Sequence, residues 1–290
     1  MAIKIDSGCY ECFLRRHVAT ARSLGSEEKA TEFARRMLRA CLDAPEDTPS
    51  PVIGTVVSDL LLEMYGLPLD RFRQEKIDSN RFVMERMEDI RQKVTAAPDP
   101  VLAGLQMAIL GNYLDYGALQ GQISFEKLEE MLEDALRMDL DREVFARFCR
   151  DLERGKKLLY LTDNAGEIGF DRVFAEAIHE KYPHLEITFC VRGDIAGNDA
   201  LREDAIAVGI PFPVIDSGDR TAGTLIPRLG REARTALEEA DVIVAKGMAN
   251  TETMFGCGYN VYYAFLVKCQ RFVRIFDKSM LTPIFTAERK

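Results

Sequence analysis

Residues 157–167 of this 290-residue chain read KLLYLTDNAGE, in which an apolar run at 158–162 leads into a polar, glycine-containing cluster. Further apolar runs follow at 187–191, 212–215 and 242–245, with helical patterns between them near 168–181, 199–208 and 225–239. Fully apolar runs of four to six residues are typical of strands buried on both faces. Their alternation with helices predicts a doubly wound α/β fold with a largely parallel sheet. The tail is ambiguous, because 261–267 fits a strand or a helix and 271–276 alternates like a strand.

The first half of the chain has a different pattern. From about Cys9 to Arg154, apolar residues recur three and four positions apart, which is the spacing of an amphipathic helix. Proline-containing breaks fall at 44–51, 66–68 and 98–100. We therefore expect a mainly helical domain at residues 1–154, packed against an α/β domain at residues 155–290 that carries the functional site.

The composition limits the classes of function. The chain has a formal charge of -9, whereas clustered Lys and Arg drive binding to nucleic-acid phosphates. No stretch approaches the roughly 20 apolar residues of a membrane span, and the start of the chain lacks a signal-peptide pattern. Seven cysteines without the spacing of a small secreted domain indicate reduced thiols. We expect a cytoplasmic protein that binds neither nucleic acid nor membrane, and the sequence leaves a homo-oligomer open.

Four polar clusters lie directly after the expected strands. They are Asp163 to Glu167, Arg192-Gly193-Asp194 leading to Asn198-Asp199, Asp216-Ser217-Gly218, and Lys246-Gly247. Because the carboxyl ends of parallel strands share one edge of a sheet, these clusters are expected to converge in one crevice. The oxygens of Asp163, Asn164 and Asp199 are ligands that hard cations such as Mg²⁺ and Mn²⁺ prefer. Helix capping is the competing interpretation of each Asp-Asn pair.

The same clusters offer groups for an anionic substrate. Lys246 ends an apolar run, so we expect its side chain to enter the crevice and neutralise phosphate oxygens. Gly166 allows close backbone approach ahead of a helix N-terminus that presents free N–H groups to an anion. Arg192 is expected to pair with a substrate carboxylate or phosphate, or with an acidic neighbour. Asn198 and Asn250 are further candidates for substrate contact, with loop capping as the alternative for Asn250.

Other sites of α/β folds fit the sequence poorly. Residues 163–169 read DNAGEIG, which lacks the Gly-x-Gly-x-x-Gly of a dinucleotide-binding loop. A phosphatase with Asp163 as an aspartyl nucleophile stays an alternative, although Ala165 stands where the second acid of such a site usually lies, two residues later. A methyltransferase that acts on carboxylates usually has an acid at the end of the second strand, where Arg192 stands.

Taken together, the clusters resemble the metal-dependent damage-control phosphatases, the family known as domain of unknown function 89. The resemblance covers most of the chain. It is carried by Asp163 to Glu167, Arg192-Gly193, Asn198-Asp199, Asp204-Ala205, the Gly218 turn, Ala240-Asp241, Ala245-Lys246-Gly247 to Asn250, and Gly111-Asn112 with Asp115. Cys9-x-x-Cys12 with Arg15 resembles the archaeal and bacterial branch. Met248-Ala249 departs from the family's frequent Gln-Gly on the substrate side, so the substrate stays open.

The resemblance implies a helical domain joined to a three-layer α/β domain. It implies a divalent cation, Mg²⁺, Mn²⁺, Co²⁺ or Ni²⁺, held by Asp163, Asn164 and Asp199, with Lys246 as the phosphate-site lysine. In the expected reaction, water attacks a phosphomonoester of a small, damaged or side-product metabolite. The expected catalytic residues are Asp163, Lys246 and Glu167, the last as a base or to orient the water. A non-catalytic protein that binds a phosphorylated metabolite with metal is the main alternative, ahead of the methyltransferase.

The remaining thiols and imidazoles give weaker signals. Cys9 and Cys12 lack the second Cys-x-x-Cys that a four-ligand zinc site would need, so helix packing competes with a metal or disulfide role. The histidines at 17, 179 and 184 have no i,i+4 metal spacing and are expected at the surface or in packing.

Overall fold

The computed structural model describes residues 3–115 and 123–288, and its centre is one six-stranded sheet in the order β3-β2-β1-β4-β5-β6. The strands are β1 (Lys157–Leu161), β2 (Glu186–Val191), β3 (Val214–Asp216), β4 (Val242–Lys246), β5 (Val261–Leu266) and β6 (Pro283–Ala287). The first five pair in parallel, and β6 pairs antiparallel with β5. This confirms the predicted doubly wound, largely parallel sheet. Chain order reverses between β1 and β4, which is the position where such sheets bind ligands.

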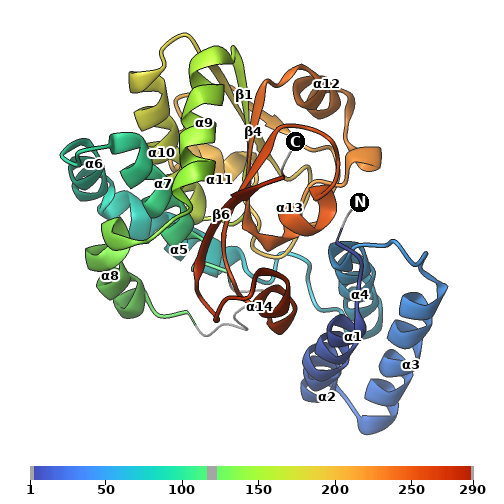
Figure 1. Ribbon diagram of the computed structural model, residues 1–290. Coiled ribbons are helices and arrows are strands. Elements are labelled where there is room, and N and C mark those ends of the chain that lie inside the picture. The colour runs from blue at the N-terminus through green and yellow to red at the C-terminus, as the bar shows by residue number, and fades with distance from the viewer. Residues whose placement is uncertain (1–2, 116–122, 289–290) are drawn as a thin grey trace.

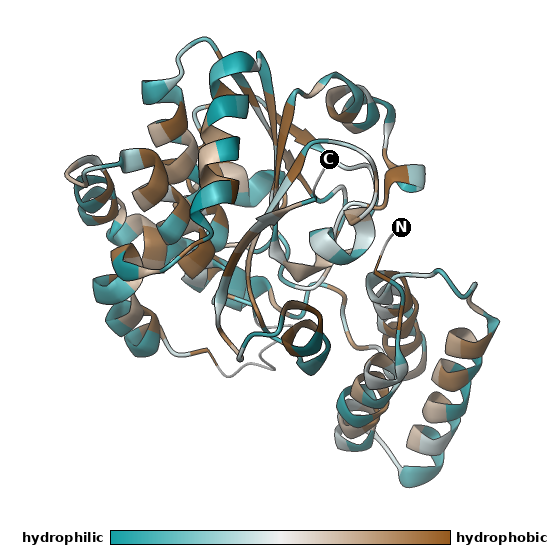
Figure 2. Ribbon diagram, in the orientation of Figure 1, coloured by the Kyte–Doolittle hydropathy of each residue, from teal (hydrophilic) through white to brown (hydrophobic). Residues whose placement is uncertain are grey.

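Helices cover both faces of the sheet (Figure 1). Those after β1 are α10 (Glu167–Lys181), α11 (Arg202–Ala207), α12 (Arg231–Glu239), α13 (Gly247–Met254) and α14 (Gln270–Phe276), with a 3-10 turn at Ile226–Arg228. Alternate strand residues belong to different cores: Leu158 and Tyr160 pack with α7 and α10, whereas Leu159 and Leu161 pack on the side of α12 and α14. The central strands β1, β4 and β5 are therefore buried on both faces, and brown colour dominates the middle of the sheet in Figure 2.

The first half is helical, as predicted. Its helices are α1 (Ser7–Phe13), the π-helix η1 (Leu14–Val18), α2 (Ala19–Leu24), α3 (Glu27–Asp43), α4 (Ser50–Tyr65), α5 (Arg73–Glu85), α6 (Met87–Thr95), α7 (Pro100–Gly111), α8 (Phe125–Asp134) with a 3-10 turn at Ala135–Arg137, and α9 (Arg142–Arg154). The predicted proline breaks separate α3 from α4, end α4 at the αL residue Gly66, and start α7, where Asp99 caps the helix.

These helices divide into two groups by the core they join. Helices α1 to α4 share a core of their own, which includes Phe33, Met37 and Val57. They form the lobe at the lower right of Figure 1. Helices α5 to α9 contribute instead to the core beneath the sheet, and α7 packs directly on α10. The division into domains at residues 154 and 155 stays a prediction, since one core includes side chains from both sides of that point.

The tail differs from its predicted pattern. The apolar run at 261–267 is a strand, but the alternating segment at 271–276 is the helix α14. Phe272 and Phe276 are four residues apart, and both rings pack against Phe265 of β5. A helical face therefore explains this segment better than strand alternation. Among the described residues, no helix combines the length and apolar character that membrane crossing requires.

Candidate functional site

Asp163 lies just after β1, beside β4 at the switch point of the sheet. Its Oδ2 accepts hydrogen bonds from Asn112 Nδ2 at 2.9 Å and from Asn164 Nδ2 at 2.8 Å. Gly247 has a φ of 78°, and a Cβ there would lie 2.0 Å from Asp163 Oδ2. Only glycine fits this contact, which brings the first turn of α13 against the carboxylate. Asp163 is 5% exposed, and within residues 3–115 and 123–288 no group donates to its Oδ1.

The loop after β2 closes onto the loop after β1. A single antiparallel bridge joins the backbones of Asn164 and Asp199, and Ala200 N donates to Asp163 O at 2.7 Å. Asn198 Nδ2 donates to Asn164 Oδ1 at 2.8 Å. The three residues predicted to bind a metal are therefore brought together. Asn198 therefore holds the Asn164 side-chain amide in place, so its own amide N–H is used within the protein and not for a substrate.

Arg192 follows β2 and is almost fully buried. Its Nε donates to Asp199 Oδ2 at 2.7 Å, and its Nη atoms donate to Gly223 O and Thr162 O. Asn250 is buried beside it and donates to the same Thr162 carbonyl at 3.1 Å. Of the two partners predicted for Arg192, the structure contains the acidic neighbour. Arg192 and Asn250 therefore hold the loops of the site together, and the predicted substrate contact of either residue finds no support in their bonding.

Gly166 lies between the cluster and α10 with a φ of 77°. A Cβ on Gly166 would lie 2.6 Å from Ser79 Cβ, and its N–H donates to Asn80 Oδ1 at 2.7 Å. Glycine is therefore required at position 166 because the backbone there packs closely against α5. The Gly166 N–H itself is not available to an anion, because a side chain of the helical half already accepts its hydrogen bond. That the start of α10 presents free N–H groups to an anion stays a prediction.

Glu167 is fully buried at the start of α10. Its Oε1 accepts from Lys246 Nζ at 2.6 Å, and its Oε2 accepts from Asn112 Nδ2 at 2.9 Å and from Asn164 Nδ2 at 2.7 Å. The carboxylate thus fixes the two amides that bond to Asp163. With every oxygen occupied and no exposed surface, Glu167 is placed to position other residues, not to act as the predicted base or water ligand.

Lys246 ends β4 and is 0% exposed. Its Nζ donates to Ala108 O at 2.7 Å, to Glu167 Oε1 at 2.6 Å and to Asp171 Oδ1 at 2.8 Å. An ammonium group has three N–H donors, so all are engaged. Tyr160 Oη also donates to Asp171 Oδ1 at 2.8 Å. The prediction that Lys246 enters the crevice is wrong, because α7 and α10 cover the strand end and supply the partners.

A second buried lysine was not predicted. Lys268 lies two residues beyond β5, and its Nζ donates to Asp115 Oδ2 at 2.6 Å and to Asn112 O at 2.8 Å. Asp115 and Asn112 belong to the motif at the end of α7 that contributes to the family resemblance. A lysine after an apolar run is the same signal that led to Lys246. It was overlooked because the run at 261–267 was not assigned to a strand.

The carboxylates of the site repel one another. Burial, reinforced by the charges of Glu167, Asp199 and Asp115, raises the pKa of Asp163 well above its usual range, and the Lys268 charge opposes that rise. Burial also raises the pKa of Asp199, although a guanidinium pairs with it. Crowded carboxylates of this kind are stabilised by a nearby cation.

The donor atoms fit a hard divalent cation. Asp163 and Asp199 each use Oδ2 for hydrogen bonds and receive none at Oδ1 from the described part of the chain, and Asn164 adds an amide oxygen. Carboxylate and amide oxygens are the ligands that Mg²⁺ and Mn²⁺ prefer. No group of three His, Cys, Asp or Glu side chains suited to a metal occurs among the described residues, which is consistent with a set whose third donor is an amide.

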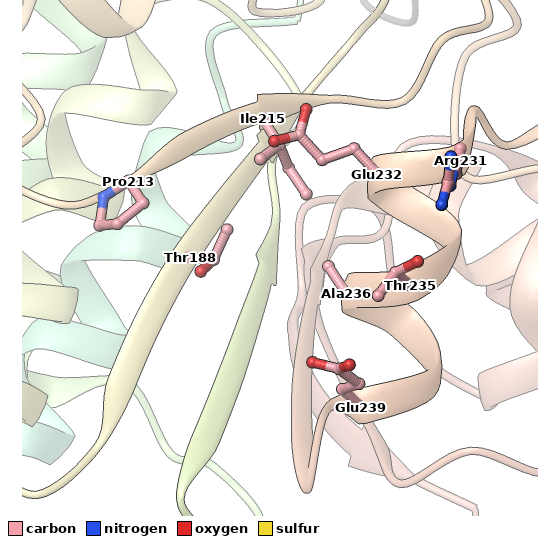
Figure 3. Close-up of a pocket in the computed structure, with 8 residues that line it drawn as sticks. All are labelled: Thr188, Pro213, Ile215, Arg231, Glu232, Thr235, Ala236 and Glu239. Carbon is pink, nitrogen blue, oxygen red and sulfur yellow. The ribbon is translucent and has the colours of Figure 1, made fainter.

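A surface depression lies elsewhere, between the β2–β3 edge and α12 (Figure 3). It is lined by Thr188, Pro213, Ile215, Arg231, Glu232, Thr235, Ala236 and Glu239. None of these residues belongs to the clusters at the carboxyl edge, and Thr188 lies in the middle of β2. The depression is therefore separate from the candidate site.

The two N-terminal cysteines lie on α1, and all seven cysteines are free. Arg271 Nη1 donates to Cys9 Sγ at 3.3 Å. Burial raises the pKa of Cys9 to about 11, so its thiol stays protonated at neutral pH. This thiol contributes to packing between α1 and α14, while the assignment to an archaeal and bacterial branch stays a prediction.

Comparison with known proteins agrees with this architecture. An uncharacterized protein of Methanocaldococcus jannaschii is 31% identical over 286 residues, which are 93% of this chain and 90% of the relative. Proteins named damage-control phosphatase from Archaeoglobus fulgidus and Pyrococcus horikoshii are 28% and 29% identical and match 94% and 91% of this chain, and 95% and 92% of their own. The crystal structure of a P. horikoshii protein of family 89 has the same fold, with a TM-score of 0.83, 23% identity and 99% of each chain covered.

The family comparison covers the candidate site and both halves of the chain. The model of the damage-control phosphatase ARMT1-like domain matches residues 5–280. This match includes Asp163, Asn164 and Asp199 together with the helices that hold them. The chain belongs to the damage-control phosphatase ARMT1-like domain family.

Proposed function

We propose that this protein is a divalent-metal-dependent phosphatase that hydrolyses phosphomonoesters of small metabolites. Its family and the names of two relatives support the activity. The observation that carries the proposal is the buried group of Asp163, Asn164 and Asp199. Two carboxylates there have raised pKa values, and each keeps one oxygen that receives no hydrogen bond from the described residues.

These three side chains would hold the cation. When bound, a divalent cation polarises a phosphoryl oxygen and lowers the pKa of a water molecule, which makes hydrolysis feasible at neutral pH. The surrounding residues keep the donors in place: Glu167 and Asn112 orient Asp163 and Asn164, and Arg192 does so for Asp199. Supporting bonds of this kind hold metal ligands ready in one geometry.

Lys268, just beyond β5, and the backbone N–H groups at the start of α13 are the groups that would bind the phosphoryl oxygens. Two of the three Lys268 N–H donors bond to Asn112 O and Asp115 Oδ2, and the third has no acceptor among the described residues. The first N–H groups of α13 have no partner within the helix. Since Gly247 touches Asp163, these N–H groups lie beside the proposed cation position. Lys268 and α13 would together stabilise charge on the transferred phosphoryl group.

We propose Mg²⁺, Mn²⁺, Co²⁺ or Ni²⁺ as the cation and a small phosphorylated metabolite as the partner. Nucleic acids and membranes are not proposed as partners, in keeping with the charge of -9. Seven free thiols fit a reducing compartment, so the proposed location is the cytoplasm.

The test uses chelator-treated protein and Asp163→Asn, which keeps the shape of the side chain and removes its charge. We expect metal-dependent phosphate release from a panel of sugar phosphates, nucleotides and p-nitrophenyl phosphate, and loss of both release and calorimetric metal binding in the variant. Because the crowded carboxylate is destabilised by its neighbours, the melting temperature of metal-free Asp163→Asn should equal or exceed that of the unchanged protein.

Asp134→Ala is the matched control, since Asp134 is exposed on α8 and pairs with Arg137 only on the surface. This control should keep full activity. An active Asp163→Asn enzyme would contradict the proposal. Metal binding through Asp163 without phosphate release from any compound would favour a non-catalytic binding protein.

A further inference from the structure

Helix α5, in the helical half, contacts the candidate site through the buried side chain of Asn80. Its Oδ1 accepts a hydrogen bond from the Gly166 N–H at 2.7 Å, and its Nδ2 donates to Asp204 Oδ1 at 2.8 Å. Gly166 lies two residues after Asn164, in the loop that follows β1. Asp204 lies in the first turn of α11, which follows the loop after β2. One amide therefore links the two segments that carry the proposed metal ligands.

Asp204 connects Asn80 to the backbone of the second loop. Its Oδ2 accepts from the Leu201 N–H at 2.8 Å, and Leu201 lies two residues after Asp199. Lys76, one helical turn before Asn80, has its Nζ 2.8 Å from the same oxygen and compensates the buried negative charge. Three donors therefore fix the orientation of this carboxylate. We call Lys76, Asn80 and Asp204 the α5 clamp.

The loops after β1 and β2 are thus joined at two levels. Next to the sheet, Ala200 N donates to Asp163 O at 2.7 Å, and an antiparallel bridge joins Asn164 and Asp199. Two residues beyond the last proposed ligand of each loop, the α5 clamp forms a second connection. The distance between the two sets of ligand oxygens therefore depends on a helix outside the sheet.

The packing of α5 leaves the first loop little freedom to move. A Cβ on Gly166 would lie 2.6 Å from Ser79 Cβ, and α5 packs against both α10 and α11. A small cation such as Mg²⁺ requires its ligands in a nearly ideal geometry, so a small shift of one loop would weaken binding. Residues that hold metal ligands in place typically change metal affinity or activity 10- to 100-fold when they are substituted.

We propose that Asn80 is a positioning residue for the metal site. Through Asp204, it sets the separation between the loop that carries Asp163 and Asn164 and the loop that carries Asp199. This inference rests on the proposed function, because it uses the cation position proposed there. Asn80 contacts neither the cation nor the substrate in this proposal, and it acts only through the two loops.

The experiment measures calorimetric Mn²⁺ binding to the full-length protein, beside kcat/KM for phosphate release. Asn80→Leu removes both amide bonds with little change in size and none in charge. We expect its Mn²⁺ affinity to fall about 10- to 100-fold, with a matching fall in kcat/KM at limiting Mn²⁺. Asn80→Ala gives the same comparison if the leucine variant does not fold, because its smaller side chain leaves room for a water molecule at the Gly166 N–H.

A double variant that exchanges the two groups, Asn80→Asp with Asp204→Asn, tests the bond itself. The new amide at position 204 can donate to the new carboxylate at position 80, which can still accept from the Gly166 N–H. Lys76 keeps a carboxylate within the clamp, and the net charge equals that of the unchanged chain. We expect this exchange to recover most of the Mn²⁺ affinity that Asn80→Leu loses. A role in stability alone would not predict that recovery.

The matched control is Arg91→Met. Arg91 lies on α6, and its Nε and Nη2 each donate to Glu176 at 2.8 Å in the second half of α10, so it also joins the helical half to α10. This variant should lower the melting temperature while Mn²⁺ affinity and kcat/KM stay unchanged. Thermal melting of every variant verifies that it is folded at the temperature of the binding measurement.

Each outcome decides between the two proposals. If folded Asn80 variants bind Mn²⁺ as tightly as the unchanged protein, if the folded exchange variant binds no better than Asn80→Leu, or if Arg91→Met loses as much affinity, the positioning role is overturned and the metal site stands. If Mn²⁺ binding depends on Asn80 but no compound releases phosphate, the proposed phosphatase fails and the positioning role stands. If the unchanged protein binds no Mn²⁺, both are rejected.

Discussion

A buried lysine lies at the end of β4 and another lies just beyond β5, but the two differ in the number of carboxylates that surround them. Lys246 and Lys268 both follow apolar strands, and both are buried. Lys246 is enclosed by Glu167 and Asp171 of α10 and by a carbonyl of α7, which engage its three donors. Lys268 bonds to one carboxylate, Asp115, which keeps some exposure at the crevice. We therefore expect a structural role for Lys246, in contrast to the role in the reaction proposed for Lys268.

The largest effect is expected at the enclosed lysine. Lys246→Met leaves Glu167 and Asp171 buried without their cation, and removal of one partner of a buried ion pair costs about 3–5 kcal/mol. Urea unfolding should show that loss in the free energy of unfolding. Adding Asp171→Asn should recover part of it, because one of the two uncompensated carboxylates is then neutral. A loss below about 1 kcal/mol would show that Lys246 is not the structural lysine.

Lys268→Met should show the reverse balance between stability and activity. Its partner Asp115 keeps 16% exposure and can gain water, so the expected loss of unfolding free energy is smaller than the about 3–5 kcal/mol expected for Lys246→Met. The kcat/KM for phosphate release should fall about 100-fold, as for removal of one preorganised donor from a charged transition state. Steady-state kinetics beside urea unfolding gives both numbers. An unchanged kcat/KM would show that Lys268 takes no part in the reaction and so does not differ from Lys246 in that respect.

Tyr160→Phe should give the smallest effect and sharpen the comparison. Its hydroxyl donates to Asp171 Oδ1 below the site, far from any proposed substrate contact. Loss of this neutral hydrogen bond should cost about 1 kcal/mol of unfolding free energy. The kcat/KM should stay within experimental error. A large fall in kcat/KM, with the protein still folded, would show that the buried network under Lys246 takes part in the reaction.

Much of the site was predictable because strand direction is a local property. An apolar run marks a buried strand, and the residues that follow it must emerge at the carboxyl edge. Asp163, Asn164 and Asp199 were predicted to converge for this reason, and the structure brings them together. The helical first half and its proline breaks were predictable on similar grounds, since helix spacing and proline geometry act within a few residues.

The misassignments share one cause. Gly166 and Lys246 were assigned to an anion, but Asn80 accepts a hydrogen bond from the Gly166 N–H and Glu167 accepts one from the Lys246 ammonium group. Both partners lie far along the chain, 86 residues from Gly166 and 79 residues from Lys246. A sequence pattern does not reveal which distant group satisfies a buried donor, although nearly every buried donor has to be satisfied.

The sequence by itself determined the alternation of strands and helices, the edge where the polar clusters meet and the family resemblance. Each depends on the order and local spacing of residues. Only the tertiary structure decided which lysine is enclosed by two carboxylates and which group accepts the hydrogen bond of the Gly166 N–H. Those outcomes depend on how α5, α7 and α10 pack across the sheet, because burial and long-range partners set the charge environment of a side chain.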